Sequence, residues 1–194
     1  MNDTIVRTSK LLSFVLRHRP EEIGIELDPS GWVAVPALLE ALAVNGHDIS
    51  LAELEIVVKE NDKQRFTIKN GLIRANQGHS ISISLGLEPR TPPDYLYHGT
   101  TTKFLAAILQ TGLQKMRRHH VHLSLDTATA QRVGMRHGEP TVLKVQSSAM
   151  HRNGQEFFLS DNGVWLTDSV APQYIEVIHR DRSATSSHGN SLAE

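Results

Sequence analysis

The stretch "LGLEPRTPPDY", residues 85–95, constrains the fold of this chain most, because its prolines interrupt any helix or central strand that would cross it. Helical spacing of apolar residues is common before it, and short alternating segments dominate after it. We therefore predict two lobes joined by a linker, spanning residues 1–88 and 89–180. The tail, residues 181–194, lacks apolar periodicity and is predicted to be disordered.

The first lobe is predicted to contain helices followed by a β-hairpin. One helix finishes on "LSFVLRHRP", and a second follows the short β segment in "GWVAV". Ser50 is the expected N-cap of a third helix, with Glu53 completing a capping box. Asn70 and Gly71 separate two alternating segments, which is a strong hairpin signal. This order predicts a small winged-helix-like module.

The second lobe is predicted to be richer in strands. The strand in "DYLYHG" leads into an amphipathic helix closed by Gly112, and Asp126 is placed to cap a later helix. Further short strands are expected in "VHLSLD", "TVLKVQ", "QEFFLS", "GVWLT" and "YIEVI". The whole chain is therefore predicted to be α+β, and it lacks the glycine fingerprints of dinucleotide-binding and P-loop folds.

Composition excludes several classes of protein. The 194 residues include no cysteine, so disulfides and thiolate chemistry are excluded and a reducing cytoplasm is expected. No apolar run is long enough for a membrane helix, and no secretory signal is visible, so we expect no membrane partner. A formal net charge of −1 disfavours non-specific coating of DNA, although it allows a few arginines aimed at one phosphate. We expect a monomer.

The end of the first helix carries the first candidate site. Leu11, Phe14, Val15 and His18 follow the i, i+3, i+4, i+7 spacing, so His18 is predicted to continue the apolar face. A cationic last turn also suits the helix dipole, which is an ordinary role for Arg17. At this point a core histidine and a built site both remain possible.

Other polar residues stand where a fold alone does not need them. Arg65 begins a strand and Arg136 ends a helix, where a solvated charge and dipole compensation are the respective ordinary explanations. His98, Gly99 and Thr100 follow an apolar strand and precede a helix, where glycine lets the backbone approach a ligand and a hydroxyl can bind phosphate or ribose.

The stretch "RRHHVHL" raises the possibility of zinc, because His120 and His122 project on the same side of a strand. Cysteine and an H-E-x-x-H helix are both absent, so a metal site is disfavoured and a basic, substrate-facing edge is preferred. A serine hydrolase is disfavoured because the chain has no G-x-S-x-G elbow.

Taken together and in order, several stretches resemble one family. They are "SKLLSFVLRHRP", "GWVAVPALL", "KQRFTI", "IRANQGHS", "YLYHGT", "HHVHLS", "VGMRHG" and "NGVWLT". They are similar to the RNA 2′-phosphotransferases, NAD-dependent enzymes that complete tRNA splicing in fungi and also occur in bacteria. The resemblance extends from Ser9 to Ile178.

The resemblance implies a winged-helix-like RNA lobe beside an ADP-ribosyltransferase-like lobe that binds NAD and consumes it, without a metal. An internal RNA 2′-phosphate would displace nicotinamide from NAD, giving a 2′-phospho-ADP-ribosyl RNA intermediate. The ribose 2″-hydroxyl would then attack that phosphate, releasing 2′-OH RNA and ADP-ribose 1″,2″-cyclic phosphate. Guanidinium groups suit such a phosphate, and an imidazole suits the proton transfer.

The resemblance also implies roles for particular residues. The family's catalytic tetrad would be Arg17, His18, Arg65 and Arg136. The NAD pocket would be lined by His98, Gly99, Thr100, His122 and Ser124. Weaker candidates for holding NAD or RNA phosphates are Arg74, Gln77 and His79. Val164 stands where many toxin-like ADP-ribosyltransferases have a catalytic glutamate, which counts against modification of proteins.

Two other functions remain possible. The chain could be a winged-helix regulator with a ligand-sensing second lobe, but "LAELEIVVKEND" is acidic where a recognition helix would be basic. It could also be an ADP-ribosyltransferase that caps a nucleic-acid phosphate and stops after the first step. The sequence separates this function poorly from the complete reaction, although a histidine with three arginines favours completion.

Overall fold

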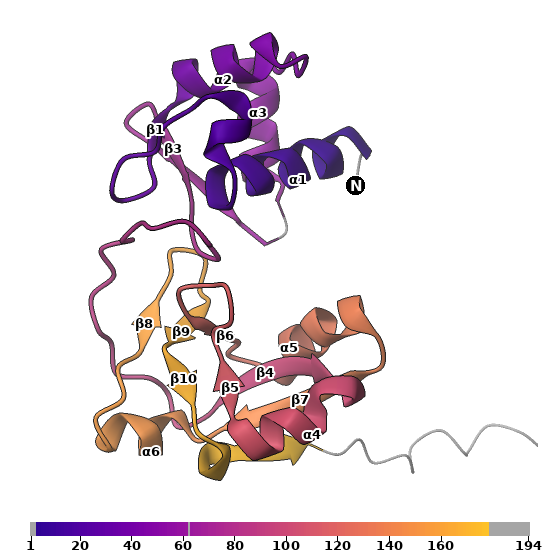
Figure 1. Ribbon diagram of the computed structural model, residues 1–194, viewed down its shortest axis with the longest axis vertical. Helices are drawn as coiled ribbons and strands as arrows, with labels where there is room; N and C mark the ends of the chain where they lie inside the picture. The colour runs from indigo at the N-terminus through magenta and orange to yellow at the C-terminus, as the bar shows by residue number, and fades with distance from the viewer. Residues whose placement is uncertain (1–2, 62, 179–194) are drawn as a thin grey trace, which may run out of the picture.

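The structure is a computed structural model of the chain and describes residues 3–61 and 63–178. Figure 1 shows two lobes, one containing the elements from α1 to β3 and the other those from β4 to β11. Both lobes combine helices with small antiparallel sheets, so the predicted α+β class is confirmed. The predicted disorder of the tail lies outside the described residues.

Helices and strands of both lobes are short. The α-helices are α1 (Asp3–Arg17), α2 (Val35–Val44), α3 (Leu51–Lys59), α4 (Thr102–Thr111), α5 (Thr127–Gly134) and α6 (Ser147–Arg152). The strands are β1 (Val33–Ala34), β2 (Phe66–Lys69), β3 (Leu72–Ala75), β4 (Leu96–Thr101), β5 (Leu113–Gln114), β6 (Val121–Leu123), β7 (Pro140–Val145), β8 (Phe158–Leu159), β9 (Trp165–Thr167), β10 (Ser169–Val170) and β11 (Ile175–Ile178). The 3₁₀ turns are η1 (Pro20–Ile23), η2 (Met135–His137) and η3 (Pro172–Tyr174).

The local signals of the first lobe act as predicted. The Ser50 side chain accepts a hydrogen bond from the Glu53 amide at 3.3 Å, and Glu53 bonds back to the Ser50 amide at 2.9 Å, so the capping box begins α3. Asn70 and Gly71 both have positive φ and join β2 to β3 in a tight antiparallel hairpin. β1 pairs with the far side of β3. The predicted hairpin and third helix are confirmed.

The predicted orientation of His18 is wrong. Leu12, Val15 and Leu16 form the buried stripe of α1, whereas Phe14 is 44% exposed and His18 is exposed. The amides of His18 and Arg19 both donate to the Phe14 carbonyl, so the chain leaves the regular helix at this point. Helical spacing therefore no longer determines where the imidazole points.

Three small sheets form the second lobe. β4, β7 and β11 form one antiparallel sheet, in the order β11-β7-β4. β6, β9 and β8 form a second, and β5 pairs with β10 in a third. Backbone bonds of 2.9 and 2.7 Å between Tyr97 and Ser124 connect β4 to the end of β6. The sequence patterns missed β5, β10 and α6, which are each too short to show a period.

Each lobe has a hydrophobic core of its own. One cluster of buried side chains runs from Leu12 to Ala75, and the other runs from Leu96 to Val170. The linker is fixed to the second lobe, since the Arg90 amide donates to the Phe157 carbonyl and the Ser147 hydroxyl to the Pro93 carbonyl, both at 2.7 Å. The boundary between residues 88 and 89 stays a prediction. Among the described residues, no helix combines the length and apolar character needed to span a bilayer.

Candidate active site

Arg17, the last residue of α1, lies partly buried where the two lobes meet. Its Nη2 donates to the Arg65 carbonyl at 3.4 Å, and its guanidinium lies 5.9 Å from the centre of the Phe66 ring. Its Nε is buried and has no hydrogen-bond partner among the described residues. Burial, with the charges of Arg65 and Arg118, lowers the pKa of Arg17 to about 10, so the group stays cationic at neutral pH.

His18 turns towards the segment that follows β3. Its Nδ1 lies 2.9 Å from the Ser80 hydroxyl, and the Ser80 amide donates to the Arg17 carbonyl at 2.9 Å. Partial burial and the neighbouring charges of Arg17 and Arg118 lower the pKa of His18. The ring is therefore tied to a hydroxyl, exposed on one side, and largely neutral at pH 7, which suits an acid–base group.

Arg65 precedes β2 in a segment fixed by several hydrogen bonds. Its Nη1 donates to Asn61 Oδ1 at 3.2 Å, and its carbonyl accepts the Asn76 amide at 2.8 Å. Asn76 also donates through Nδ2 to the Gln64 carbonyl at 2.7 Å. These bonds and the bond from Arg17 place two guanidinium groups on adjoining segments of the first lobe.

Two histidines of the second lobe have tautomers that the contacts determine. His98 Nδ1 lies 3.0 Å from the His122 carbonyl, so Nδ1 carries the proton and Nε2 keeps a lone pair. Arg118 Nη1 lies 3.3 Å from His122 Nδ1; a guanidinium can only donate, so His122 carries its proton on Nε2. Burial lowers the pKa of both histidines. The pKa of His122 falls to about 3, with the charge of Arg118 as a further cause. Both rings are therefore neutral at pH 7.

Arg17 of the first lobe and His122 of the second lobe both lie close to Gly78. A Cβ on Gly78 would lie 3.6 Å from Arg17 Nη1 and 3.9 Å from His122 Nε2. The Nε2 of His122 is buried without a hydrogen-bond partner in the part of the chain described. Arg17 therefore brings a cationic N–H group, and His122 a neutral N–H that has no partner among the described residues, close to the same point. Such donors fit an oxyanion of a phosphate.

Comparisons with known proteins agree with this chemistry. A family model described as "RNA 2'-phosphotransferase, Tpt1 / KptA family" matches residues 3–169. A "Probable RNA 2'-phosphotransferase" of Nostoc punctiforme is 55% identical over 181 residues, which is 92% of this chain and 100% of that protein. The chain belongs to the RNA 2′-phosphotransferase family.

Relatives described in the same words occur in other bacteria. One of Streptomyces griseus is 52% identical over 179 residues, covering 88% of this chain and 95% of its own. One of Herpetosiphon aurantiacus is 53% identical over 173 residues, with the same two shares. The family predicted from the sequence stretches is therefore confirmed, and every predicted site residue lies within the matched segment.

Arg118 is a residue of the candidate site that the sequence patterns did not single out. It contacts His122 directly, and its own pKa is lowered by burial and by the charge of Arg136. Arg136 is exposed in η2, so the structure relates it to His122 only through Arg118. The signal was present in "RRHHVHL", where two arginines precede the histidine-rich strand. Convergence of all four tetrad side chains on one oxyanion stays a prediction.

The glycine of "HGT" has a packing role. A Cβ on Gly99 would lie 1.7 Å from the Ala130 carbonyl oxygen of α5, and one on Gly134 would lie 2.5 Å from the Thr100 carbonyl oxygen. The two glycines therefore allow α5 to lie directly against β4. Thr100 is buried beside this contact. The predicted approach of a ligand to Gly99 is untested, but the contact with α5 alone requires glycine.

The weaker candidates of the first lobe are mostly enclosed. Arg74 Nη2 pairs with Asp161 Oδ2 at 3.0 Å, and the guanidinium lies 4.6 Å from the Trp32 ring centre. His79 is 1% exposed with both ring nitrogens lacking partners among the described residues, whereas Gln77 is half-buried. Within the described ranges no group of three metal-ligating side chains occurs. Arg74 therefore contacts protein groups, and His79 is enclosed.

Proposed function

We propose that this protein removes an internal 2′-phosphate from RNA, of the kind left at a tRNA splice junction, and consumes NAD in doing so. The exchange would pass through a 2′-phospho-ADP-ribosyl RNA and give 2′-OH RNA, ADP-ribose 1″,2″-cyclic phosphate and nicotinamide. We assign the first lobe to a winged-helix-like module that binds RNA and the second to an ADP-ribosyltransferase-like module that binds NAD. Membership of the family and the descriptions of the relatives support the proposal.

One structural observation carries the proposal: the Arg17 guanidinium and the His122 imidazole, which come from different lobes, both lie close to Gly78, and His122 Nε2 has no partner among the described residues. An RNA phosphate held by the first lobe would there meet groups of the second. The phosphate must be gripped while it exchanges oxygens, and a permanently charged guanidinium stabilises negative charge in both states. Arg65 would add a second guanidinium, since it is attached to Arg17 through its carbonyl.

The residues of the second lobe fit NAD by the chemistry of their donors and acceptors. His98 Nε2 is an acceptor for a ribose hydroxyl, because Nδ1 is used by the His122 carbonyl. His122 Nε2–H is a neutral donor for a phosphate or ribose oxygen. NAD would supply the electrophilic ribose carbon. The chain would orient the groups around it, and no carboxylate is required to activate a phosphate nucleophile.

His18 is the group best placed to move a proton. Its Nδ1 contacts the Ser80 hydroxyl, and its lowered pKa leaves a lone pair available at neutral pH. In the second half of the exchange a ribose hydroxyl loses a proton and the departing RNA 2′-oxygen gains one. An imidazole beside guanidinium groups serves either transfer, and we assign this role to His18.

The test mixes the purified protein with NAD and a short RNA carrying one internal 2′-monophosphate. We expect nicotinamide release together with conversion of the RNA to its 2′-hydroxyl form, measured by chromatography and mass spectrometry of both products. Nicotinamide release with the phosphate left on the RNA and ADP-ribosylated would indicate the capping reaction. Binding of RNA without any nicotinamide release would indicate the regulator and refute the enzymatic proposal.

A further inference from the structure

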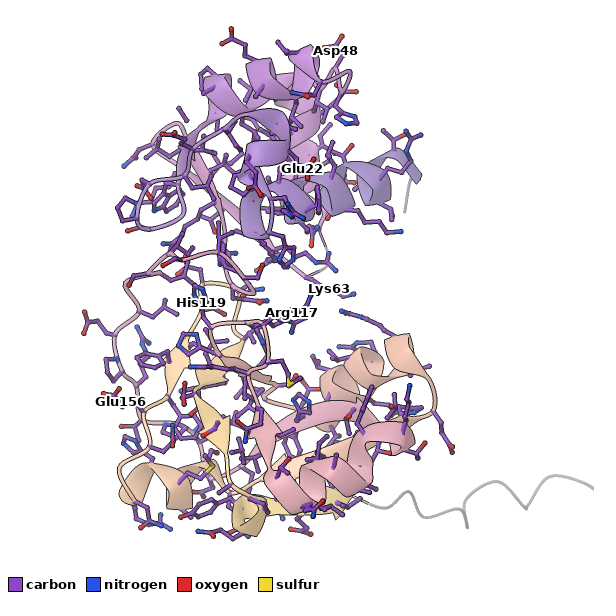
Figure 2. The ribbon with its side chains drawn as sticks, in the orientation of Figure 1. Glu22, Asp48, Lys63, Arg117, His119 and Glu156 are labelled. Atoms are coloured by element: carbon purple, nitrogen blue, oxygen red, sulfur yellow. The ribbon has the colours of Figure 1, made fainter. Side chains whose placement is uncertain are left out.

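One turn of the second lobe makes two polar contacts with the first lobe. It comprises residues 160–163 and joins β8 to β9. Asp161 Oδ2 pairs with Arg74 Nη2 at 3.0 Å, and Asn162 Nδ2 donates to the Lys63 carbonyl at 2.9 Å. Figure 2 shows Lys63 on the first lobe at the level where the two lobes face each other. The two contacts therefore connect the second lobe to two segments of the first lobe.

The turn is held in shape by its own hydrogen bonds. The Ser160 amide donates to the Val164 carbonyl at 3.0 Å, and the Gly163 amide to the Ser160 carbonyl at 2.9 Å. The buried Ser160 hydroxyl lies 2.8 Å from Asn162 Oδ1, which leaves the amide nitrogen of Asn162 directed at Lys63. Gly163 has φ +76°, a conformation that favours glycine. The turn therefore presents Asp161 and Asn162 in a fixed geometry.

The contacted groups of the first lobe belong to the candidate site or support it. Lys63 lies two residues before Arg65, whose guanidinium is held by Asn61 in the same segment. Arg74 faces Thr67 across the hairpin that Arg65 precedes. The turn thus contacts both the segment that carries Arg65 and the neighbouring strand.

We propose that Asp161 and Asn162 are positioning residues that hold the segment carrying Arg65 at a fixed place relative to the histidines of the second lobe. This inference rests on the proposed function, in which a phosphate bound by first-lobe arginines reacts with NAD bound by the second lobe. The catalytic geometry tolerates little displacement, because a misplacement of about 1 Å can cost about 100-fold in rate.

A purely structural role predicts a different result. The side chain of Asp161 is 49% exposed, so water screens this ion pair. The side chain of Arg74 is 11% exposed, and it keeps its contacts with the Leu85 carbonyl and the Trp32 ring when the carboxylate of Asp161 is removed. The bond from Asn162 to Lys63 joins two lobes that each have their own core. Loss of these contacts is therefore expected to change the position of one lobe relative to the other more than it changes the free energy of unfolding of either lobe.

The kinetic test compares each variant with a matched control in the second lobe. Asn162→Asp replaces the donor by a carboxylate, whereas Asn153→Asp makes the same change at a residue bonded to Tyr174. Asp161→Asn and Asp168→Asn each remove one ion pair, the latter with Lys115. For Asp161→Asn and Asn162→Asp we expect kcat on the 2′-phosphorylated RNA to fall about 10- to 100-fold, with KM for NAD nearly unchanged. Wild-type rates in these two variants would overturn the inference.

A double-mutant cycle asks whether Asn162 acts through Arg65. Arg65→Lys retains a cation but loses the planar fork, so it should keep measurable single-turnover activity. If Asn162 positions Arg65, adding Asn162→Asp to Arg65→Lys should slow the reaction much less than it slows the wild type. Full additivity of the two effects would contradict the inference.

A distance measurement separates this inference from the proposed function. The chain has no cysteine, so cysteines introduced at the exposed positions Glu40 on α2 and Lys103 on α4 can be spin-labelled uniquely. We expect pulsed electron resonance to give a narrow distance distribution, broadened or shifted by Asn162→Asp and unchanged by Asn153→Asp. An unaltered distribution in Asn162→Asp would overturn the inference even if the wild type is fully active. An altered one would support it even if the wild type proved inactive on RNA.

Discussion

The two lobes bring different kinds of group to the point near Gly78. The first lobe contributes guanidinium groups, Arg17 and Arg65, joined through a backbone carbonyl. The second contributes His98 and His122, buried enough to be neutral at pH 7 and fixed in one tautomer by their hydrogen bonds. Charge on one side suits a phosphate, and neutral donors and acceptors on the other suit the hydroxyls of a ribose. The difference fits the proposed function, in which the first lobe holds the RNA phosphate and the second holds NAD.

The largest effect is expected from removing a cation of the first lobe. Arg65→Ala should slow removal of the 2′-phosphate by about 100- to 1,000-fold, because a charge-stabilising donor is lost where negative charge gathers. The second half of the reaction should be slowed more than the first, so ADP-ribosylated RNA should accumulate. The same accumulation is expected in His18→Ala and Arg136→Ala. Single-turnover assays with electrophoresis of the RNA measure this accumulation.

The control for Arg65→Ala is Arg7→Ala, which removes an exposed guanidinium from the outer face of α1. It should retain wild-type turnover. Unchanged turnover in Arg65→Ala would show that Arg65 takes no part in the reaction, and it would weaken the comparison between the lobes.

The sequence predicted local features of the fold better than it predicted the candidate site. Ser50 with Glu53 and Asn70 with Gly71 determine structure within a few residues, so the helix start and the hairpin could be predicted. His18 could not be placed, because it lies just beyond the last helical turn, where the chain leaves the helical period. Arg118 was missed because its role depends on a contact with His122 that only the folded strand creates.

The second-largest effect is expected from the packing of the second lobe. Gly99→Ala should lower the free energy of unfolding by about 2–3 kcal/mol, because the new methyl group would meet the Ala130 carbonyl oxygen and force α5 away from β4. Urea denaturation measures the change. Gly154→Ala is the control, since that site has positive φ but open space, and only about 1 kcal/mol should be lost there. Equal losses of unfolding free energy at Gly99 and Gly154 would show that α5 can shift away from β4 at little cost.

A smaller effect should follow from changing the tautomer in the second lobe. Arg118→Ala removes the donor to His122 Nδ1, so the ring is free to carry its proton on either nitrogen. Histidine ¹⁵N shifts should show protonation at Nε2 in the wild type and a mixture in the variant. Activity should fall about tenfold through the lost orientation of one donor. A wild-type ring protonated at Nδ1 would refute the assignment of His122 as the neutral donor.

The last effect appears only on acidification and concerns His79, which is buried and resembles the neutral histidines of the second lobe. Burial and the charges of Arg17, His119, His18 and Arg74 lower its pKa to about 3. The unfolded chain binds a proton at this residue below about pH 6.5, whereas the folded chain does not until about pH 3. Stability should therefore be fully present above the higher pH and fall as the solution is acidified between these limits.

His79 should contribute a slope of up to about 1.4 kcal/mol per pH unit in that window, since one proton separates the folded and unfolded states. His79→Gln replaces the imidazole by a group that does not titrate, so its unfolding free energy, measured in urea at pH 7, 6 and 5, should fall less steeply than that of the wild type. His122 has a similarly lowered pKa and remains in the variant, so a residual slope is expected. Parallel slopes in the two proteins would mean that His79 becomes protonated in the folded state near its ordinary pKa. The first lobe would then carry a further cation beside Arg17, and the contrast between charged and neutral sides would be sharper still.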